Sequence, residues 1–333
     1  MKAFILDRYG KTAGLRLGEM PEPEMGENDV LADIHAASVN VLDSKIRNGE
    51  FKLLLPYRLP LVLGHDMAGV VVRVGSKVQR FKPGDEVYAR LDTARIGAFA
   101  EMIVMNEEAV AHKPRMLGME EAASLPLVAL TAWQVLVERA NLKKGQKVLI
   151  HAGSGGVGTV AIQLAKHLGA FVATTTSAAN ADWVERLGAD VVIDYGKENF
   201  EQVLQGYDVV LNSLGADVLE KSLQVLKPGG KLISISGPPD PEFAKEIGAP
   251  WFMRQAMRLL SYRIRKKAKR HVVSYSFLFM RASGDQLREI GSLVDSGAIR
   301  PVVDQTFPFA ATNEAMAYVD KGRAKGKVVI KVR

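Results

Sequence analysis

The stretch of sequence that decides the fold reads, over residues 148–158, Val148-Leu149-Ile150-His151-Ala152-Gly153-Ser154-Gly155-Gly156-Val157-Gly158. An apolar run of strand length meets a cluster of glycines here. Beyond the glycines, apolar side chains recur at helical spacing over residues 157–168, and Gly169 is placed to end that helix. A strand, a glycine turn and a helix in this order form the context that a dinucleotide-binding G-x-G-x-x-G fingerprint requires.

Each glycine of this motif has a physical task. Gly153 allows the tight turn, Gly155 lets the backbone approach a pyrophosphate, and Gly158 lets the helix pack close to the strand. The exposed N–H groups and the positive end of the helix dipole then face the anion. An ordinary flexible loop is the alternative for an isolated glycine motif. The matching strand and helix on either side favour the cofactor site.

Length and composition limit the class of protein. A chain of 333 residues with 47% hydrophobic and 24% charged side chains is typical of a globular protein with two domains. The chain has no apolar run of about 18 residues, and its start, which soon meets Asp7 and Arg8, does not resemble a signal peptide. Because cysteine is absent, disulfides and thiolate metal sites are excluded. We therefore expect a cytoplasmic enzyme with no membrane partner.

The N-terminal third of the chain predicts a small β domain. Short apolar runs alternate with turns that contain glycine or proline, which is typical of a distorted barrel. One short helix interrupts the strands, since Asn40 is placed to cap it and Gly49 to end it. Asp43 and Arg47 have the i, i+4 spacing of an ion pair on that helix.

From residue 119 onward, helical patterns alternate with strands. The strands expected after the glycine turn cover residues 171–176, 191–195, 209–213, 231–236 and 272–279. Helices are expected at 180–187 and 217–226, and Pro228-Gly229-Gly230 is placed to stop the second one. Repeated β–α units give a doubly wound parallel sheet, so we predict an α/β fold with a β domain and a parallel-sheet domain.

The end of the strand after the glycine helix indicates which nicotinamide cofactor is bound. An acidic residue there would hydrogen-bond the ribose 2′-hydroxyl of NAD. This chain has no acid between the strand and Asp182, whereas Thr176 and Ser177 offer hydroxyl groups to a 2′-phosphate. A threonine-rich strand with no such role is the alternative, because threonine favours strands. We expect NADP(H).

Further motifs follow one another along the whole chain. They are Asn40 in its short helix, Gly64 to Gly69, Pro83-Gly84-Asp85-Glu86-Val87, Leu125-Pro126 through Thr131-Ala132-Trp133, the glycine turn, Leu187-Gly188-Ala189-Asp190 and Gly326-Lys327-Val328-Val329. In these motifs and their order the chain resembles the medium-chain dehydrogenase/reductases. Within that superfamily it resembles the zinc-free quinone oxidoreductase branch and is similar to the NADPH-dependent alkenal/one oxidoreductases.

The resemblance implies a domain plan and an activity. Residues 1–123 would form a GroES-like β-barrel domain, which residues 274–333 complete, and residues 124–273 would form a Rossmann NADP-binding domain. The protein would be a homodimer that transfers hydride from NADPH to a quinone or to the C=C bond of an α,β-unsaturated carbonyl compound.

The resemblance also implies the site residues. Asn40 would lie beside the nicotinamide ribose. Lys45 and Tyr57 lie in the right region of the chain to act as catalytic residues, with surface solvation as the alternative for Lys45 and core packing as the alternative for Tyr57. We expect no single side chain to be an essential proton donor. Ser177 and Tyr195 would contact the adenosine 2′-phosphate. The cofactor-binding residues implied are Asn40, Thr131, Gly153, Ser154, Gly155, Gly156, Val157, Gly158, Thr176, Ser177, Tyr195, Ser213, Leu214, Ser236, Gly237, Phe279 and Lys327.

Several positions depart from related proteins. Asn180 stands where relatives often carry a lysine for the 2′-phosphate, and Asn212 stands where aspartate is more usual. His65-Asp66 resembles the Gly-His-Glu element of zinc alcohol dehydrogenases, but Asn40 stands where their first cysteine ligand would be. Catalytic zinc needs about three protein ligands, so we expect no metal and treat His65 as part of a structural pair.

Two other functions are weighed. A zinc-type alcohol dehydrogenase is disfavoured by the missing cysteines. An NADPH-binding protein that attaches to nucleic acid or to a membrane surface through the basic run of residues 263–270 would suit the net charge of +7. That run has no interleaved aromatic residue beyond Tyr262, so a solvated helix face is favoured and a nucleic-acid partner is not expected.

Overall fold

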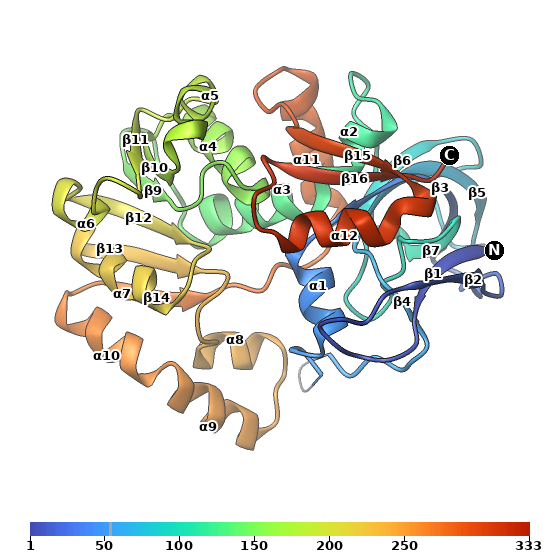
Figure 1. Cartoon of the computed structure of the whole chain (residues 1–333), viewed down its shortest axis with the longest axis horizontal. Coiled ribbons are helices and arrows are strands. Elements are labelled where there is room, and N and C mark those ends of the chain that lie inside the picture. The colour runs from blue at the N-terminus through green and yellow to red at the C-terminus, as the bar shows by residue number, and fades with distance from the viewer. Residues whose placement is uncertain (53–54) are drawn as a thin grey trace. The chain divides into compact units, whose positions relative to one another are not determined.

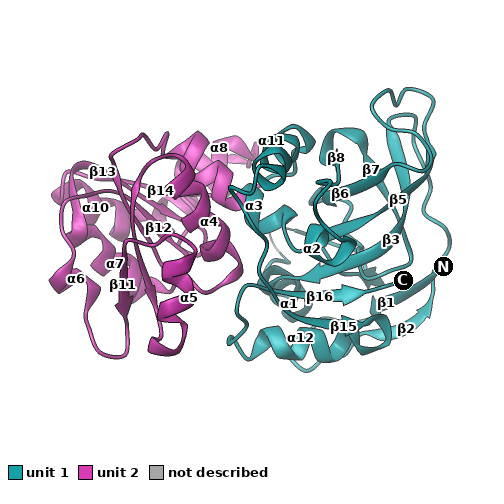
Figure 2. Cartoon of the chain, turned by 90° about the horizontal axis from the view of Figure 1, so that it is seen from above, with its two compact units in different colours: residues 1–130, 281–333 teal, residues 131–280 magenta. Residues whose placement is uncertain are grey.

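The computed structural model describes residues 1–52 and 55–333 (Figure 1). The chain forms two compact units (Figure 2), unit 1 with residues 1–130 and 281–333 and unit 2 with residues 131–280. Unit 2 is therefore an insertion in the chain of unit 1. None of the described helices is long and apolar enough to cross a membrane.

Unit 2 is built on a six-stranded parallel sheet. Its strand order is β11-β10-β9-β12-β13-β14, and every neighbouring pair is parallel. The strands are β9 (Lys147–Ile150), β10 (Phe171–Thr176), β11 (Val191–Asp194), β12 (Tyr207–Asn212), β13 (Leu226–Ser234) and β14 (Ser274–Phe277). This topology confirms the predicted doubly wound parallel sheet. Because β14 pairs with β13, it belongs to this sheet, although the domain limit expected at residue 274 would separate it.

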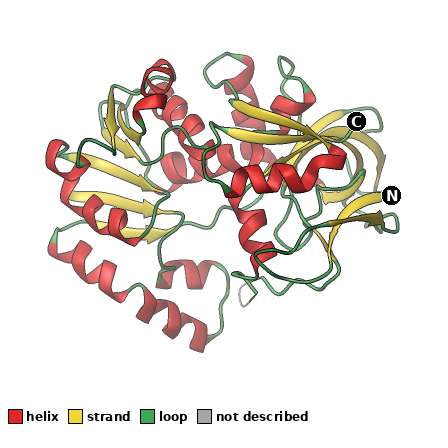
Figure 3. Ribbon diagram, viewed as in Figure 1, coloured by secondary structure: helices red, strands yellow, loops and turns green. Residues whose placement is uncertain are grey.

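Helices join the strands of unit 2 (Figure 3). They are α4 (Gly156–His167), α5 (Ala181–Arg186), α6 (Phe200–Val203), α7 (Ala216–Val225), α8 (Pro241–Glu246), α9 (Trp251–Leu260) and α10 (Tyr262–Arg270), after α3 (Pro126–Trp133) and a π-helical turn at Gln134–Arg139. Most strand boundaries lie within two residues of the expectation, and the largest difference is at the start of β13. β13 begins at Leu226, ahead of Pro228-Gly229-Gly230, because a shift in its register with β12 and the positive φ of Gly229 absorb these residues.

Unit 1 is built on antiparallel strands. Its larger sheet has the order β15-β16-β3-β5-β6-β8, with β7 also paired to β3, and a second sheet has the order β2-β1-β4. The strands are β1 (Lys2–Leu6), β2 (Arg16–Glu19), β3 (Asp29–Val39), β4 (Leu61–Val62), β5 (Asp66–Val74), β6 (Glu86–Arg90), β7 (Met102–Asn106), β8 (Val110–His112), β15 (Val303–Pro308) and β16 (Lys327–Lys331). The helices are α1 (Val41–Asn48), α2 (Met119–Ala123), α11 (Gly284–Asp295) and α12 (Thr312–Asp320).

The core of unit 1 forms around β3, which pairs with strands from both ends of the chain. β3 pairs with β16 through Val39↔Val328 and with β5 along most of its length. Gly69 of β5 is required at this contact, because a Cβ atom there would lie 1.9 Å from the carbonyl oxygen of Asp33. A larger residue would force the two central strands apart.

A buried histidine joins three elements of unit 2. His151 follows β9, and its Nδ1 and Nε2 atoms lie 3.1 Å from Thr175 Oγ1 and 2.9 Å from Ser222 Oγ. The ring also packs edge-on against Phe200, with 4.7 Å between the ring centroids. Burial lowers the pKa of His151 to about 4, because the imidazolium form would lose its hydration.

This burial predicts an acid-sensitive contribution to stability. The unfolded chain protonates His151 near the ordinary histidine pKa of about 6.5, whereas the folded protein does so near 4. The contribution is therefore fully present above about pH 6.5 and is lost as the pH falls toward 4.

In urea unfolding, the free energy of unfolding of the wild type should fall by about 2 kcal/mol more than that of His151→Gln between pH 7 and pH 5. The control His167→Gln removes an exposed histidine of the same unit and should leave this loss unchanged. An equal loss in wild type and His151→Gln would contradict the prediction.

Candidate functional site

Most candidate cofactor residues of unit 2 lie at one edge of its sheet. All six strands are parallel, so their carboxyl ends meet at the same edge (Figure 3), which is where open α/β sheets bind ligands. Each strand end is followed by candidates: Gly153 to Gly158 after β9, Thr176 and Ser177 after β10, Tyr195 after β11, Ser213 and Leu214 after β12, Ser236 and Gly237 after β13, and Phe279 after β14. Thr131, the remaining candidate of this unit, is buried in α3.

Two of the three glycines in the fingerprint are required by packing. A Cβ atom on Gly153 would lie 2.2 Å from Thr174 Oγ1, and one on Gly158 would lie 2.3 Å from the carbonyl oxygen of Ala152. Gly155 is different, because a Cβ atom there would meet only Ala152 O at 3.4 Å, an ordinary contact. Gly155 is also the N-cap residue of α4, at the positive end of the helix dipole. The protein itself therefore has room for a side chain at Gly155, beside backbone that can receive an anion.

Short polar contacts hold neighbouring strand ends in place. Thr176 Oγ1 donates to Ser154 Oγ at 3.0 Å, which ties the end of β10 to the glycine turn. Ser236 Oγ donates to the carbonyl oxygen of Leu214 at 2.7 Å, and Gly237 N donates to Ser234 Oγ at 2.8 Å. These contacts tie the end of β10 to the glycine turn and the end of β13 to the end of β12.

Asn212 now has a physical explanation. It is fully buried at the end of β12, where its Nδ2 atom donates to Leu214 O at 3.0 Å and to Ser234 Oγ at 3.1 Å. Its Oδ1 atom accepts from Leu214 N at 3.4 Å. An amide can donate and accept in this way, whereas an aspartate would lack the two donors. Asn212 therefore shapes the turn that carries Ser213 and Leu214.

The end of β10 carries hydroxyl and amide groups. Thr176 is buried, and Ser177 Oγ accepts a hydrogen bond from Asn180 Nδ2 at 3.2 Å. Trp183 Nε1 in turn donates to Asn180 Oδ1 at 3.2 Å, which fixes the amide. Tyr195, at the end of the neighbouring strand, is exposed. This region offers hydrogen-bonding groups and no carboxylate at the position where NAD-specific sites place one.

In unit 1 a buried polar cluster joins Asn40, Asp66 and Lys327. The Lys327 ammonium donates to Asn40 Oδ1 at 2.5 Å and to the carbonyl oxygen of Val39 at 3.1 Å, and it lies 3.5 Å from Asp66 Oδ2. Asp66 also accepts hydrogen bonds from Asn40 Nδ2 at 2.9 Å, from Ser38 Oγ and from the backbone N–H of Leu127. Burial lowers the pKa of the Lys327 ammonium, and the nearby carboxylates of Asp66 and Asp43 oppose that shift.

A second buried pair corrects two local predictions. Asp43 Oδ1 lies 2.6 Å from His65 Nδ1, and Asp43 Oδ2 accepts from the backbone N–H of Asn40, the N-cap residue of α1. The expected Asp43–Arg47 pair is wrong, because Arg47 instead donates to Asp320 on α12 at 2.9 Å. The partner of His65 is thus Asp43 and not its neighbour in sequence. Within residues 1–52 and 55–333, no three His, Cys, Asp or Glu side chains gather as a group that could hold a metal.

Arg90 was not among the candidates expected from the sequence. It is almost fully buried at the end of β6, opposite Asp66 in the sheet. Its Nη1 atom donates to Leu91 O and to Thr93 Oγ1. In the described part of the chain, Arg90 Nε, Arg90 Nη2 and His65 Nε2 have no hydrogen-bond partner. Buried donors of this kind are rare. These donors mark this part of unit 1 as a candidate site for a polar ligand atom. The sequence did not indicate it, because Arg90 ends a mostly apolar strand.

Lys45 and Tyr57 occupy partly buried positions in the same unit. Lys45 lies on α1, one turn from Asn40. The Tyr57 hydroxyl donates to the carbonyl oxygen of Thr93 at 2.6 Å, and burial raises its pKa to about 12. The hydroxyl of Tyr57 is therefore a weak acid at neutral pH, and its proton already has an acceptor.

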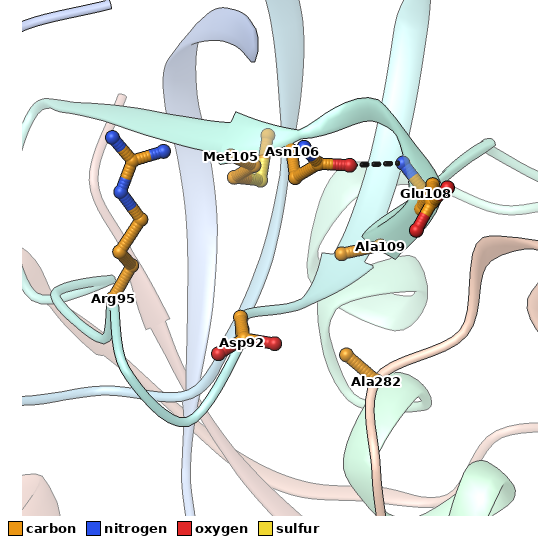
Figure 4. Close-up of a pocket in the computed structure, with 7 residues that line it drawn as sticks. All are labelled: Asp92, Arg95, Met105, Asn106, Glu108, Ala109 and Ala282. Carbon is orange, nitrogen blue, oxygen red and sulfur yellow. Dashed lines mark hydrogen bonds between the residues drawn. The ribbon is translucent and has the colours of Figure 1, made fainter. Parts of the chain in front are cut away.

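One pocket of unit 1 is separate from these residues. It has a volume of about 340 Å³ and is lined by Asp92, Arg95, Met105, Asn106, Glu108, Ala109 and Ala282 (Figure 4). Asn106 Oδ1 accepts from the Glu108 backbone N–H at 3.0 Å, so the polar wall is partly satisfied. No candidate catalytic or cofactor-binding residue is among the lining residues, so this pocket is not the predicted site.

Two known protein families match parts of the chain, and relatives match nearly all of it. The family described as alcohol dehydrogenase GroES-like domain matches residues 26–115, and the family described as zinc-binding dehydrogenase matches residues 187–330. The NADPH-dependent alkenal/one oxidoreductase, chloroplastic, of Arabidopsis thaliana is 37% identical over 99% of this chain and 79% of its own length. The NAD(P)H oxidoreductase RTN4IP1, mitochondrial, of Danio rerio is 35% identical over 100% of this chain and 91% of its own length.

Solved structures of similar proteins have the same fold as this chain. The quinone oxidoreductase from Coxiella burnetii is 32% identical and matches with a TM-score of 0.87, covering 100% of this chain and 99% of that one. These matches confirm the GroES-like domain and the Rossmann domain that the resemblance implied. The chain therefore belongs to the medium-chain dehydrogenase/reductase superfamily, together with quinone oxidoreductases and alkenal/one oxidoreductases.

Proposed function

We propose that this protein is an NADPH-dependent reductase that works without a metal. Its substrate is a quinone or the C=C bond of an α,β-unsaturated carbonyl compound. The observation that carries the proposal is the glycine turn at the N-terminus of α4, where Gly155 leaves room beside free backbone N–H groups. The names of the relatives support the reaction class, since they include alkenal/one oxidoreductases and quinone oxidoreductases.

The residues at the sheet edge fit the phosphate groups of NADPH. The backbone of Gly155, Gly156 and Val157 would hold the pyrophosphate. The hydroxyl groups of Thr176, Ser177 and Tyr195 would hold the 2′-phosphate, and the missing carboxylate at the end of β10 favours NADPH over NADH. Ser154 belongs to the glycine turn itself. Ser213, Leu214, Ser236 and Gly237 follow β12 and β13, so they would line the rim on the side of the turn away from the 2′-phosphate. When bound, NADPH supplies a hydride.

The other contribution of the chain is position and electrostatics. Asn40 and Lys327 would border the nicotinamide ribose, and their mutual hydrogen bond fixes both side chains before any ligand binds. Thr131 and Phe279 would contact the cofactor from unit 2. Lys45 offers a positive charge for the oxygen of the substrate, where negative charge develops during reduction. Because the Tyr57 hydroxyl is a weak acid with its proton already shared, water can supply the final proton.

We also propose that the enzyme works in the cytoplasm as a homodimer. The family resemblance supports the dimer, and β14 is an outer strand of the sheet of unit 2, with a backbone edge that a second copy could extend. Sedimentation equilibrium measures the mass of the protein in solution, which should be twice the chain mass of 36.3 kDa. A species of 36.3 kDa at all concentrations would contradict the dimer.

The reaction class is tested by NADPH oxidation with a matched set of substrates. We expect turnover with benzoquinone or phenanthrenequinone, or with acrolein and nonenal, and about 100-fold less with the saturated aldehyde nonanal. Nonenal and nonanal differ only in the conjugated double bond, so the pair isolates the group that accepts the hydride. NADH should be the poorer cofactor. Reduction of nonanal as fast as nonenal, or a preference for NADH, would contradict the proposal.

The glycine turn gives a sharper test of cofactor binding. Gly155→Ala should fold with unchanged thermal stability, because its Cβ meets only an ordinary contact at 3.4 Å. It should weaken NADPH binding about tenfold or more, since the added methyl group stands where the pyrophosphate would approach. Gly158→Ala is the matched control and should lose stability, because its Cβ would lie 2.3 Å from a backbone oxygen. NADPH affinity is measured by fluorescence titration. An unchanged affinity in Gly155→Ala would contradict the proposal that this turn binds the pyrophosphate.

The proton donor is tested by two substitutions. Lys45→Ala should lower turnover about tenfold through the lost positive charge, and Tyr57→Phe should lower it less, well short of the 10²–10⁴-fold range of a general acid. Both variants should keep the wild-type affinity for NADPH. A fall of about 10³-fold in either one would identify an essential proton donor.

A further inference from the structure

Helices α9 and α10 form a nearly continuous rod at the surface of unit 2. They follow each other through Ser261 and lie end to end (Figure 1). One face of the rod packs inward, since Met257, Ser261, Ile264 and Ala268 are buried at helical spacing. The opposite face therefore points away from the core of the unit.

That outer face carries large apolar side chains. Trp251, Phe252, Leu259, Leu260 and Tyr262 are between 54% and 78% exposed. Scattered exposed apolar residues are common, but a cluster of this size on one helix indicates an interaction surface. Trp251, Leu259 and Tyr262 are spaced so that they share one side of the rod.

The same rod holds the positive charge of the chain. Its cations are Arg254, Arg258, Arg263, Arg265, Lys266, Lys267, Lys269 and Arg270, and it has no Asp or Glu. The whole chain has 44 Lys and Arg against 37 Asp and Glu. Without these eight cations, 36 remain against 37 acids, so the rest of the chain is close to neutral. The net charge of +7 is thus concentrated on two adjacent helices.

Few of these cations are neutralised by the protein. Arg263 and Lys267 both pair with the single carboxylate of Glu220 on α7. Arg258, Lys266, Lys269 and Arg270 form no ion pair within the described residues, and Lys266 lies 5.7 Å from the ring centre of Tyr262. Their charges are free to meet an anionic partner.

We propose that the α9–α10 rod docks on the surface of a bilayer that contains anionic phospholipid. Trp251, Phe252 and the leucines of α9 would enter the boundary between headgroups and acyl chains. The lysines and arginines of α10 would contact the lipid phosphates. An interfacial helix is recognised by this combination of bulky apolar side chains and cations, and each cation near such a surface adds to binding. This docking is independent of the proposed reductase activity.

The expectation of no membrane partner rested on the lack of a membrane-spanning segment. A helix that lies in the interface does not need one. The exposed leucines and aromatic rings of α9, which the sequence alone did not show to be uncovered, change that expectation.

Two other partners fit this surface less well. Nucleic acid would satisfy the cations of α10 but would leave Leu259 and Leu260 in water. A second copy of the chain would cover the apolar residues, but an isologous contact places the same patch on both subunits. The cations of one rod would then face those of the other, and the Glu220 carboxylate of each copy already serves Arg263 and Lys267, which opposes that contact.

The test measures co-sedimentation of the full-length protein with lipid vesicles. Wild type should bind vesicles of phosphatidylcholine with phosphatidylglycerol about tenfold or more tightly than vesicles of phosphatidylcholine alone, and should release in high salt. Lys266→Gln/Lys269→Gln/Arg270→Gln and, separately, Leu259→Ser/Leu260→Ser should each lower binding about tenfold or more. Lys11→Gln/Lys82→Gln/Lys321→Gln removes three exposed cations elsewhere and should bind as wild type.

Each variant is also checked for fold and activity. Circular dichroism and enone or quinone reduction in solution should match wild type, because none of these residues belongs to the candidate site. Equal binding to both vesicle types, or loss of binding in the Lys11→Gln/Lys82→Gln/Lys321→Gln control, would overturn the proposal. Tight binding of duplex DNA that Leu259→Ser/Leu260→Ser leaves intact, without vesicle binding, would assign the surface to nucleic acid. A dimer that only Leu259→Ser/Leu260→Ser converts to monomer, without vesicle binding, would assign it to a second copy.

Discussion

The structure of unit 1 depends on hydrogen-bond partners for two carboxylates, Asp43 and Asp66, that are buried away from water. Asp66 is held by Asn40, Ser38, a backbone N–H and the ammonium of Lys327, and Asp43 is held by His65 and two backbone N–H groups. An ionised carboxylate left unpaired in such a place costs several kcal/mol. The partners come from β3, the N-cap of α1, the two residues before β5, α3 and β16, so the constraint makes segments from opposite ends of the chain converge at one point.

Unit 2 is held together differently, by close backbone approach. Gly153 and Gly158 have no room for a side chain. The buried His151 side chain joins the end of β9 to Thr175 and Ser222. The sheet edge that results is rich in hydroxyl and backbone groups that already bond to one another. Such an edge loses little conformational freedom when it meets a ligand, which is the physical benefit of preorganisation.

The sequence predicted the parts of the fold that local patterns control. The strand, glycine turn and helix around Gly155 are local features, so they could be predicted, and the parallel sheet followed from them. The short helix between Asn40 and Gly49 could be predicted in the same way. The partner of Asp43 was not, because spacing along one helix favours Arg47, whereas burial selects His65 from a distant strand. Arg90 was missed because it ends a short, mostly apolar strand, and nothing in that local pattern shows that its guanidinium is buried. For α9, the helical pattern shows an amphipathic helix and cannot show which of its faces stays uncovered.

The order of the chain has a consequence for protein synthesis. Unit 2 is continuous in sequence, so the ribosome can release all of it before the end of translation. Unit 1 must wait, because β3 lacks its neighbour β16 until residues 327–331 emerge, about 200 residues after the rest of its N-terminal part. At typical elongation rates this delay lasts roughly 10 to 40 s. For that time β3 is paired with β5 and β7, but its residues 36–39 keep N–H and C=O groups that lack the strand β16.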